Sequence, residues 1–563
     1  MKRIETQVVI IGGGATGAGT LRDCAIRGIP AALVEKGDLT SGTSGRNHGL
    51  LHSGARYAVK DTRSARECIV ENAVLKRIAQ HCVEDTGGLF VTLDEDDYSY
   101  HEQLISACEL AGISCEDIGI RQALRIEPNV SSGIKAAIRV PDATVDPFRL
   151  VAANVLDATE RGSRVYTHTE VTGLILDGDR VAGVRCRDKT AGMDFEIRAR
   201  IVVNASGVYG QQVCNMAGVE LAMFPSKGSM IIIDYRINNT VVNRARPAAD
   251  GDIVVPGDTV SLIGTTSKKI PYSEIENLHV DDDEIEVLLA DGEKLIPNVS
   301  RTRVLRAYCG VRPLIAESTA REGREISRGI VLIDHRERDG LRGFVTIAGG
   351  KLTTCRLMAE MTTDLLCKKF GADVPCTTHE LPLPGSETPV PKKRRIKSFT
   401  GVPTSVVGST HFRHGERIHS ILSGDRRNYG LICECEMVTS GEVEYALRNL
   451  HVHDLIDLRR RTRLGMGPCQ GALCSYRAAG LTRDLGLTDA AGANAMLVEF
   501  IEERWKGVKP VLWGDALREM EFAYWIYQGL FGLAGVQADE DTPHAPEVAG
   551  ESGESGESGE GGA

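Results

Sequence analysis

Apolar and polar residues alternate along the first part of the chain in a pattern that predicts strands and helices in turn. The apolar run Val8–Ile11 predicts a buried strand, and a helical pattern begins directly after it. A second apolar run, Ala31–Val34, predicts the next strand. A strand, a helix and a strand in this order are typical of a parallel α/β sheet.

Later apolar runs predict further strands that end in turns. Glu170–Leu176 and Arg180–Arg187 predict two strands joined by the turn Asp177–Asp179. The runs at Ile201–Val203 and Phe344–Ile347 each lead into small residues, at Asn204–Gly207 and at Gly349–Thr354, and a helical pattern follows the second. Such turns can return distant parts of the chain to one cofactor.

A glycine motif at the end of the first strand indicates dinucleotide binding. Gly12, Gly14 and Gly17 have the G-x-G-x-x-G spacing, which allows a tight turn, a close approach of backbone to pyrophosphate, and close packing of helix on strand. Glu35 ends the second strand about 20 residues on, where an acidic residue binds a ribose 2′-hydroxyl. A carboxylate there disfavours the 2′-phosphate of NADP.

The order of the motifs favours FAD over a nicotinamide cofactor. An NAD dehydrogenase usually gathers its cofactor domain in one place, whereas a Rossmann unit that is interrupted by a substrate domain and completed later is the plan of flavoproteins. We therefore expect an α/β protein with a glutathione-reductase-like FAD (Rossmann-type) domain and an interleaved antiparallel-sheet substrate domain, followed by a small helical domain and C-terminal helices.

Size and composition set limits on this picture. A chain of 563 residues should form two to four domains, and a net charge of −11 gives no reason to expect nucleic acid binding. No run approaches 18 apolar residues, and the N-terminus enters a strand directly, so we expect no transmembrane helix, no signal peptide and a cytoplasmic location. The Gly/Ser/Glu-rich residues 536–563 predict a disordered acidic tail.

Four of the fifteen cysteines stand apart from the rest. Cys24, Cys68, Cys108, Cys186 and Cys214 are expected to be small core residues. Cys433 and Cys435 form C-x-C, Cys469 and Cys474 form C-x4-C, and the helix-like segments 441–450 and 453–463 lie between the pairs. Two such pairs can supply four thiolates to zinc or to an iron–sulfur cluster. Four unrelated core cysteines are the alternative.

Residues 430–485 resemble the BFD-like [2Fe–2S] domain, through the pattern CxCE…VT…DL..RTR…G.CQG..C. The resemblance implies a [2Fe–2S] cluster held by Cys433, Cys435, Cys469 and Cys474.

A second resemblance covers most of the chain. Residues 8–57, ATVDPFRL (143–150), VVNASGVYG (202–210), GVRPL (310–314), SRGIVL (327–332) and GGKLTT (349–354) resemble the FAD-dependent glycerol-3-phosphate dehydrogenase family. With the cysteine domain and the segment RWKGVKPVLWGDALRE (504–519), the chain to about residue 535 is similar to the catalytic A subunits of the anaerobic enzymes in that family.

This resemblance implies the residues that react and the residues that bind FAD. At the substrate it implies His52, Arg56, Tyr57, Arg312, Arg328 and Lys351. For FAD it implies Gly12, Gly14, Ala15, Thr16, Gly17, Glu35, Lys36, Ser44, Asn47, Gly49, Leu50, Val171, Ala205, Gly207, Gly350, Lys351, Leu352 and Thr353. Arginine forks suit a phosphate, and His52 is the expected base, with His48 as a competitor that lines the flavin.

The implied reaction is oxidation of sn-glycerol 3-phosphate to dihydroxyacetone phosphate, with electrons leaving through the cluster to B- and C-type partner subunits and the quinone pool. The protein would then be peripheral on the inner face of the membrane through those partners. The expected domains are an oxidoreductase at 1–375, a proline-rich linker at 376–428, the cluster domain at 429–485, a helical segment at 486–535 and the tail. The aromatic segment 512–533 predicts either core packing on the cluster domain, which is favoured, or a docking surface.

Two other functions remain open from the sequence. An FAD-dependent amine or amino-acid dehydrogenase can share the flavin fold and a similar cluster domain, but it would need one carboxylate-binding arginine in place of several phosphate cations. A non-enzymatic iron–sulfur module would leave the flavin motif and the segment His52–Arg56 unexplained.

Overall fold

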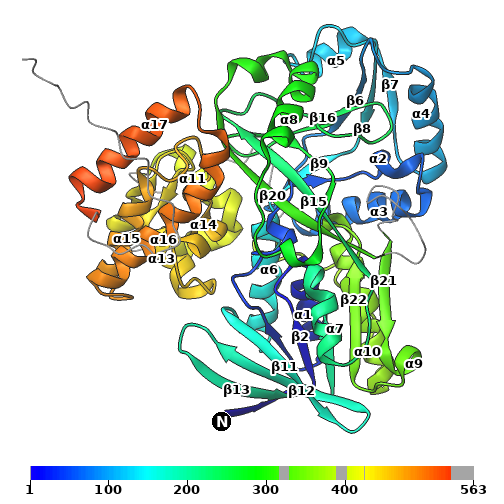
Figure 1. Cartoon of the computed structure of the whole chain (residues 1–563), viewed down its shortest axis with the longest axis vertical. Helices are drawn as coiled ribbons and strands as arrows, with labels where there is room; N and C mark the ends of the chain where they lie inside the picture. Colours follow the sequence, from blue (N-terminus) through cyan, green and yellow to red (C-terminus); the bar gives the residue numbers. More distant parts are fainter. Residues whose placement is uncertain (1, 316–328, 388–401, 424, 534–563) are drawn as a thin grey trace, which may run out of the picture.

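A computed structural model describes residues 2–315, 329–387, 402–423 and 425–533. The predicted tail and Arg328 lie outside these ranges. Three units are arranged around one junction: a flavin-type α/β unit, a substrate unit built on a large mixed sheet, and the cysteine domain with the C-terminal helices, which lies against the side of the other two (Figure 1).

The flavin-type unit is built on a six-stranded sheet. Its strands, in spatial order, are β10 (Arg164–Tyr166), β3 (Ala31–Val34), β2 (Val8–Ile11), β14 (Ile201–Asn204), β22 (Phe344–Gly349) and β21 (Ile330–Asp334). The first five are parallel, and β21 is antiparallel to β22. All residues of β2, β3 and β14 are buried, as the continuous apolar runs predict. Strands that come early in the chain (β2 and β3) and strands that come late (β22 and β21) therefore lie on either side of β14.

Different layers cover the two faces of this sheet. On one face α1 (Ala15–Ile26) packs against α6 (Pro147–Glu160) and α10 (Cys355–Phe370). The other face shares an apolar cluster with a four-stranded sheet. That sheet consists of β1 (Lys2–Glu5), β13 (Met193–Arg198), β12 (Arg180–Asp188) and β11 (Thr169–Asp177). The predicted strands and the turn between β11 and β12 are confirmed.

The substrate unit is a nine-stranded sheet. It contains β19 (Lys268–Lys269), β15 (Met223–Ile233), β18 (Ser261–Gly264), β17 (Ile253–Pro256), β16 (Val241–Arg244), β6 (Gly88–Thr92), β8 (Ala136–Val140) and β7 (Glu116–Ile118), and β20 (Val304–Ile315) pairs with β15. Helix α8 (Asp282–Leu295) buries Ile285 and Leu288 in the core of this unit. Its strands come from both sides of β10–β14 in the chain, so the two units are interleaved.

Short elements complete these two units. A three-stranded sheet joins β4 (Leu50–Leu51), β9 (Ala143–Val145) and β5 (Val83–Glu84). The remaining α-helices are α2 (Ala55–Ala58), α3 (Thr62–Ile78), α4 (Ser99–Ala111), α5 (Ile120–Ile126), α7 (Gly210–Met216) and α9 (His335–Asp339). The 3-10 turn η5 (Leu352–Thr354) joins β22 to α10.

The cysteine domain is mainly helical. The hairpin β23 (Leu431–Cys433) and β24 (Val438–Thr439) precedes α13 (Ser440–Asn449), α14 (Leu455–Thr462) and α15 (Cys474–Asp484). The C-terminal part adds α16 (Ala490–Val508), α17 (Asp515–Tyr524) and a π-helical turn, η9 (Trp525–Leu530). The two predicted helices between the cysteine pairs are confirmed.

The predicted linker is wrong for part of its length. Residues after Pro403 form α11 (Thr404–His414) and α12 (Ile418–Ile421), which place Val406, Val407, Ile418 and Ile421 in one small apolar cluster. The prolines that break regular structure lie upstream of this segment, and the apolar spacing beyond them suits helices.

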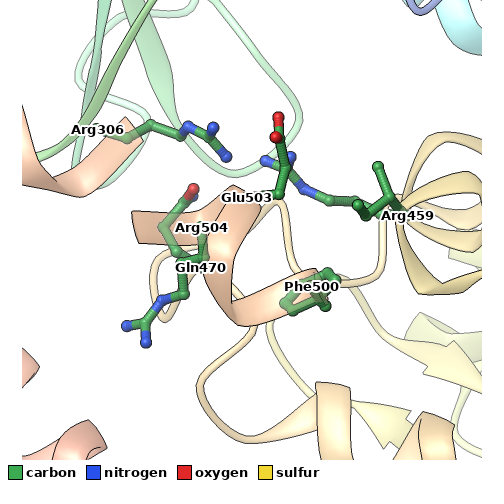
Figure 2. A pocket seen from close by; sticks show the side chains of 7 residues that line it. Arg306, Arg459, Gln470, Phe500, Glu503 and Arg504 are labelled. Atoms are coloured by element: carbon green, nitrogen blue, oxygen red, sulfur yellow. The ribbon is translucent and has the colours of Figure 1, made fainter. Parts of the chain in front are cut away.

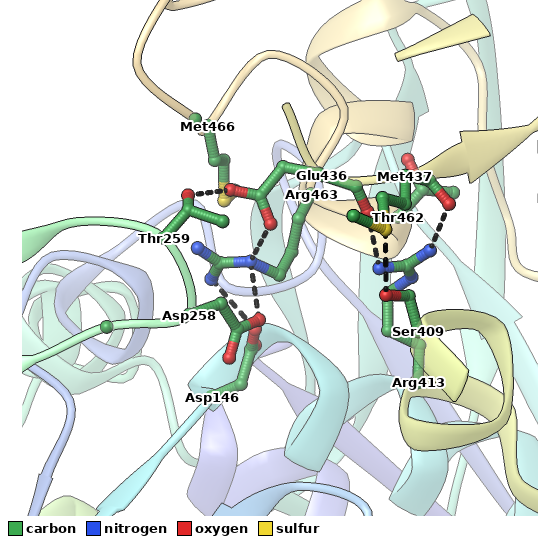
Figure 3. A network of polar contacts seen from close by, with 12 residues as sticks. Asp146, Asp258, Thr259, Ser409, Arg413, Glu436, Met437, Thr462, Arg463 and Met466 are labelled. Carbon is green, nitrogen blue, oxygen red and sulfur yellow. Dashed lines mark hydrogen bonds and ion pairs between the residues drawn. The ribbon is translucent and has the colours of Figure 1, made fainter. Parts of the chain in front are cut away.

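One arginine joins the three units. Arg463 follows α14, and its guanidinium lies 3.2 Å from Asp146 Oδ2, 2.8 Å from Asp258 Oδ2 and 3.0 Å from Glu436 Oε2 (Figure 3). Asp146 caps α6 in the flavin-type unit, Asp258 follows β17 in the substrate unit, and Glu436 belongs to the cysteine domain. The mutual placement of the units therefore depends on this contact.

Within the described ranges, no helix combines the length and the apolar character that crossing a bilayer requires.

Candidate active site

The glycine turn after β2 is shaped by close contacts. Gly12 has φ +114°, and a Cβ on it would lie 2.6 Å from Ala205 O. A Cβ on Gly17 would lie only 1.9 Å from Gly12 O. Glycine is therefore required at both positions for α1 to start against the strands β2 and β14, which orients the N-terminus of α1.

The N-terminus of α1 forms an open cradle. Gly14 precedes the helix without a side-chain cap, and the Ala15 N–H donates to Ser44 Oγ at 2.9 Å. A Cβ on Gly14 would lie 2.9 Å from the same oxygen, so a side chain there would fill the cradle. The space, the helix dipole and the uncapped N–H groups fit a pyrophosphate. Thr16 lies in the same turn, and its hydroxyl contacts Met358 Sδ at 3.6 Å.

Glu35 lies beside this cradle at the end of β3. Its Oε2 accepts from Gly13 N at 2.6 Å, and its Oε1 accepts from Gly37 N at 2.9 Å. Burial raises the pKa of Glu35, while these two N–H groups act against that rise. Each carboxylate oxygen keeps a further acceptor site for a ribose hydroxyl. Lys36 instead places Nζ 2.7 Å from Glu276 Oε1, on the substrate unit.

The other residues expected at FAD surround the same turn. Ala205 and Gly207 follow β14, and Gly207 has φ +60°. Gly350 has φ +66°, and a Cβ on it would lie 2.4 Å from Met358 Sδ. Leu352 and Thr353 form η5. After β14 and again after β22, the chain therefore comes back to the turn between β2 and α1.

The segment after Ser44 runs from the N-terminus of α1 towards His52 and Tyr57, which are expected at the substrate. Asn47 donates to Ser44 O at 2.6 Å and accepts from Gly49 N at 2.8 Å, and Leu50 begins β4. Val171 is buried in β11, within the apolar cluster shared with the main sheet.

Three of the residues expected at the substrate lie together. The Tyr57 hydroxyl is 3.5 Å from His52 Nε2, and Lys351 Nζ is 4.8 Å from the centre of the Tyr57 ring. The His52 N–H donates to Thr353 Oγ1 at 3.3 Å, which ties His52 to the turn that carries Lys351. The His48 ring is near as well, with its centroid 5.8 Å from that of the His52 ring. His52 itself is 9% exposed.

Arg312 lies on β20 and is held by protein acceptors. Its Nη1 donates to Ser226 Oγ at 3.3 Å and Lys227 O at 3.1 Å, and its Nη2 donates to Thr265 Oγ1 at 2.6 Å and Thr266 O at 2.8 Å. Strand β20 packs against β22, which leads to Lys351. Sequence reasoning missed Ser226 and Thr265, because no motif marks these strand and turn residues.

Arg56 is held separately. Its guanidinium pairs with the buried Asp252 at 2.9 Å, and Asp252 also accepts from Ala249 N. Asp252 is a second supporting residue that the sequence did not reveal. The contacts above join His52, Tyr57 and Lys351 directly; those of Arg56 and Arg312 run to other parts of the substrate unit.

The four cysteines singled out by their spacing converge in the cysteine domain. Cys433 ends β23, Cys474 begins α15, and Cys435 and Cys469 lie in the two loops. Each thiol interacts with two of the others, in the closed order Cys433, Cys435, Cys469, Cys474. Hydrogen bonds from the neighbouring thiols lower the pKa of Cys433 to about 3 and that of Cys469 to about 2. The same contacts raise the pKa of Cys435 and Cys474, so what they establish is that the four thiols lie close together.

The four thiols supply the donor set of a [2Fe–2S] cluster, in which each of two iron atoms binds two cysteines. They equally supply that of a tetrahedral zinc site with Zn–S bonds of about 2.3 Å. Gly467, where a Cβ would lie 2.6 Å from Cys435 Cβ, leaves room for this loop.

Comparison with protein families agrees with both sites. The model for FAD dependent oxidoreductases matches residues 7–365, and the BFD-like [2Fe-2S] binding domain matches residues 431–482. The expected cofactors, FAD and a [2Fe–2S] cluster, and the predicted fold class are thereby confirmed.

Two relatives extend the match over nearly the whole chain. The A subunit of the anaerobic glycerol-3-phosphate dehydrogenase of Escherichia coli (strain K12) is 56% identical over 535 residues, which are 95% of this chain and 98% of the relative. The chain belongs to the family of anaerobic glycerol-3-phosphate dehydrogenase A subunits. The family member A1 from Haloferax volcanii is 41% identical over 96% of this chain and 92% of its own length.

A solved structure supports the fold of this family member. The glycerol-3-phosphate dehydrogenase from Bacillus halodurans, complexed with FAD, superposes with a TM-score of 0.68 at 21% identity, covering 91% of this chain and 96% of that chain. At this level of identity the likeness concerns the fold alone.

Proposed function

We propose that the protein oxidises sn-glycerol 3-phosphate to dihydroxyacetone phosphate. The observation that carries this proposal is the 56% identity to the Escherichia coli relative over 95% of the chain. The side chains around His52 and Arg312 supply the groups that this chemistry needs: fixed cations for a phosphate and a histidine for an alcohol proton.

Arg312 and Lys351 bind the substrate phosphate in this proposal, and Arg56 assists them. The acceptors around Arg312 fix its guanidinium, so little side-chain entropy is lost when the dianion binds. Lys351, whose Nζ lies 4.8 Å from the centre of the Tyr57 ring, adds a second charge. Arg328 keeps the role implied by the family resemblance and lies outside the described residues.

His52 takes the proton of the C2 hydroxyl. FAD bound at the Gly12–Gly17 turn would supply the acceptor for the C2 hydride, and Nε2 of His52 would receive the hydroxyl proton as the carbonyl forms. The Tyr57 hydroxyl, 3.5 Å from that nitrogen, orients the ring or hydrogen-bonds to the substrate oxygen. The segment His52–Tyr57 therefore connects the residues expected to bind FAD to the cationic side chains expected to bind the substrate phosphate.

Cys433, Cys435, Cys469 and Cys474 would hold the [2Fe–2S] cluster, which would supply one-electron transfer to partner subunits. These subunits connect the protein to the quinone pool at the inner face of the membrane. The Escherichia coli relative is named as one subunit of its enzyme, which supports an assembly of several chains.

A docking face for such a partner lies next to the cluster. Five aromatic side chains of the C-terminal segment are 40–63% exposed: Trp513, Phe522, Tyr524, Trp525 and Phe531. Tyr527, by contrast, is buried and hydrogen-bonds to Ser475 Oγ and Ala472 O, both at 2.8 Å, beside Cys474. Phe531 packs its ring 4.8 Å from that of Tyr476, so core packing accounts for Tyr527 and part of Phe531. The exposure of the other four supports a docking face over the core packing that the sequence favoured.

The direct test is an anaerobic visible spectrum of the purified protein before and after addition of sn-glycerol 3-phosphate. Bleaching of the flavin band together with a reduced-cluster signal is expected. The alternative, an amine or amino-acid dehydrogenase, requires bleaching by proline or sarcosine and none by glycerol 3-phosphate. A Phe522→Ser/Trp525→Ser variant should keep this bleaching and lose association with the partner subunits; retained association would contradict the docking face.

A further inference from the structure

Helix α16 carries a charged residue on its buried face. The buried positions of this helix recur three or four residues apart, and they are Ala493, Leu497, Phe500, Arg504, Gly507 and Val508. Such spacing places the side chains on one side of a helix. Arginine is almost never buried unless it is paired, and Arg504 is only 8% exposed. Its position among small and apolar residues therefore calls for an anion.

The same face of α16 packs on the loop that carries Cys469. A Cβ on Gly465 would lie 2.8 Å from the Phe500 ring, and a Cβ on Gly471 would lie 2.5 Å from it. Glycine at both positions lets the ring lie against this loop. Arg504 follows Phe500 by one helical turn on the same face, and its charge interacts with the thiols of Cys469 and Cys474. The guanidinium is therefore a neighbour of two of the four cluster cysteines.

Arg504 has no carboxylate partner within the described ranges of the chain. Its Nε is buried and makes no hydrogen bond there. The nearby carboxylate of Glu519, whose charge reaches Arg504, pairs with Arg303 at 3.2 Å instead. Figure 2 shows the Arg504 guanidinium turned away from the neighbouring Glu503 and from Arg459. The protein thus supplies a buried cation without supplying its anion.

Two other cations of the cysteine domain differ from Arg504 in this respect. Arg463 lies 3.0 Å from Glu436 Oε2, and Arg477 pairs with Glu434. Both charges are compensated by carboxylates next to the cysteines in the sequence. The charge of Arg504 is left for the cysteine site itself.

A [2Fe–2S] cluster fits this unpaired cation. Two ferric ions, two sulfides and four thiolates leave a net negative charge, and reduction by one electron adds another. A buried cation with unmet donors is costly unless an anion joins it. Charge near an iron–sulfur cluster also sets its reduction potential, because a fixed cation in a medium of low dielectric favours the more negative, reduced state.

We propose that Arg504 is the internal counter-charge of the [2Fe–2S] cluster and raises its reduction potential. The electron that reduced FAD gives up adds one negative charge beside Arg504, and the guanidinium stabilises that charge. Arg504 therefore acts through the cysteine ligands and takes no part in the oxidation of the substrate. The inference deepens the electron exit of the proposed function, but its test needs no glycerol 3-phosphate, so either can fail without the other.

The test is a reductive titration of the purified protein with FAD and cluster bound. Dithionite sets the potential in the presence of redox mediators, and electron paramagnetic resonance follows the reduced cluster. Arg504→Gln should make reduction about 10-fold less favourable, which for one electron is a midpoint potential about 60 mV lower. Arg504→Lys keeps the charge and should stay close to the parent.

Lys506→Gln is the matched control. It removes the same charge from the same helix, but the Lys506 side chain is 76% exposed, so water and salt screen it and the potential should shift by less than about threefold in the equilibrium constant. The proposal is overturned if Arg504→Gln shifts the potential no more than Lys506→Gln does.

Iron and acid-labile sulfide per chain are measured first in every variant. Arg504→Met, which removes the charge and leaves no unmet donor, replaces Arg504→Gln in the titration if the latter does not retain the cluster. Loss of the cluster from Arg504→Gln and Arg504→Met, with retention in Arg504→Lys, would show the same need for a positive charge. Loss from all three variants would show that the shape of arginine is required and not its charge, which contradicts the proposal.

Discussion

The guanidinium of Arg312 is fixed by the protein before any substrate arrives. Four acceptors from β15 and from the segment after β18 hold it, and Gly228 leaves the space that it fills, since a Cβ there would lie 2.5 Å from Nη2. Arg56 is oriented in the same way by Asp252. Such pre-organisation is typical of a binding site and rare for a solvated surface arginine.

Arg312→Gln should therefore act on phosphate recognition. Loss of a charged hydrogen-bonding group is expected to raise KM for glycerol 3-phosphate about 100-fold, or roughly 3 kcal/mol, and to change KM for glycerol much less. Steady-state kinetics with both alcohols measures this, with the exposed Arg301→Gln as control. An equal loss for the two alcohols would rule out phosphate binding by Arg312.

His52→Gln should slow the chemical step. Removal of a general base costs about 100- to 10,000-fold in rate, so flavin reduction in anaerobic stopped-flow experiments should fall by at least 100-fold while FAD content is retained. His48→Gln is the matched control from the same segment. Near-normal reduction in His52→Gln would assign the base elsewhere.

At this scale the sequence predicted candidate reacting side chains but not their supports. His52, Arg56 and Lys351 lie in motifs with fixed spacing. Ser226, Thr265 and Asp252 act only because β15, the end of β18 and the turn before β17 meet these cations in space. Pairing between strands that are far apart in the chain is not encoded in any local pattern.

Among the elements, the turn between β2 and α1 tolerates the least change. Gly17→Ala would place a methyl group 1.9 Å from Gly12 O, so α1 must shift away from β2. We expect the purified variant to contain less than a tenth of the normal FAD, measured by absorbance per chain. Gly173→Ala in β11, where a Cβ meets nothing within 4 Å, should bind FAD normally; normal FAD in both variants would refute the steric argument.

Helices α11 and α13 are joined by a buried ion pair that responds to acid. Glu442 accepts from Arg413 at 2.5 and 2.7 Å and from His414 at 2.9 Å. Burial alone would raise the pKa of Glu442, but Arg413 and His414 outweigh it and hold the pKa at about 2. The ordinary value is 4.5, so the stabilisation is present above pH 4.5 and is lost as the pH falls towards 2.

The expected contribution of Glu442 to the free energy of unfolding is about 3 kcal/mol at pH 7, with roughly half of it lost by pH 3. Thermal unfolding of the parent and of Glu442→Gln, each at pH 7 and at pH 3, measures the difference in stability between the two proteins. The gap between the two proteins should narrow in acid. A constant gap would show that the charge of Glu442 is not the cause.

The main elements followed from apolar runs and glycine turns, and the structure has β2, β3 and β14 where the pattern predicts them. The sequence does not predict α11 and α12, because the prolines upstream of them dominate the local pattern. The C-terminal aromatics show a different limit: their identity predicts a buried face or a docking face equally, and only the exposure of Phe522 and Trp525 separates the two.

In the whole molecule, Arg463 connects the flavin-type and substrate units to the cysteine domain. Arg463→Gln leaves Asp146, Asp258 and Glu436 without their shared cation, which typically costs about 3 to 5 kcal/mol in buried pairs. We expect flavin bleaching by substrate at the parental rate and cluster reduction at least 10-fold slower, followed by rapid-freeze electron paramagnetic resonance. Arg448→Gln, which breaks a surface pair on α13, should change neither rate. Equal cluster reduction in both variants would contradict the role of Arg463.

The sheet order β3–β2–β14–β22 also has a consequence for biosynthesis. The site for the nucleotide is complete only when β22 has paired with β14 and the turn after β22, near Thr353, is in place. Thr353 is synthesised some 340 residues after Gly12. A nascent chain therefore carries its glycine turn through most of translation without the partner strand that closes the site. Loading of the flavin must follow synthesis of the first two units, and chains cut short before β22 are expected to be substrates for proteolysis and unable to retain FAD.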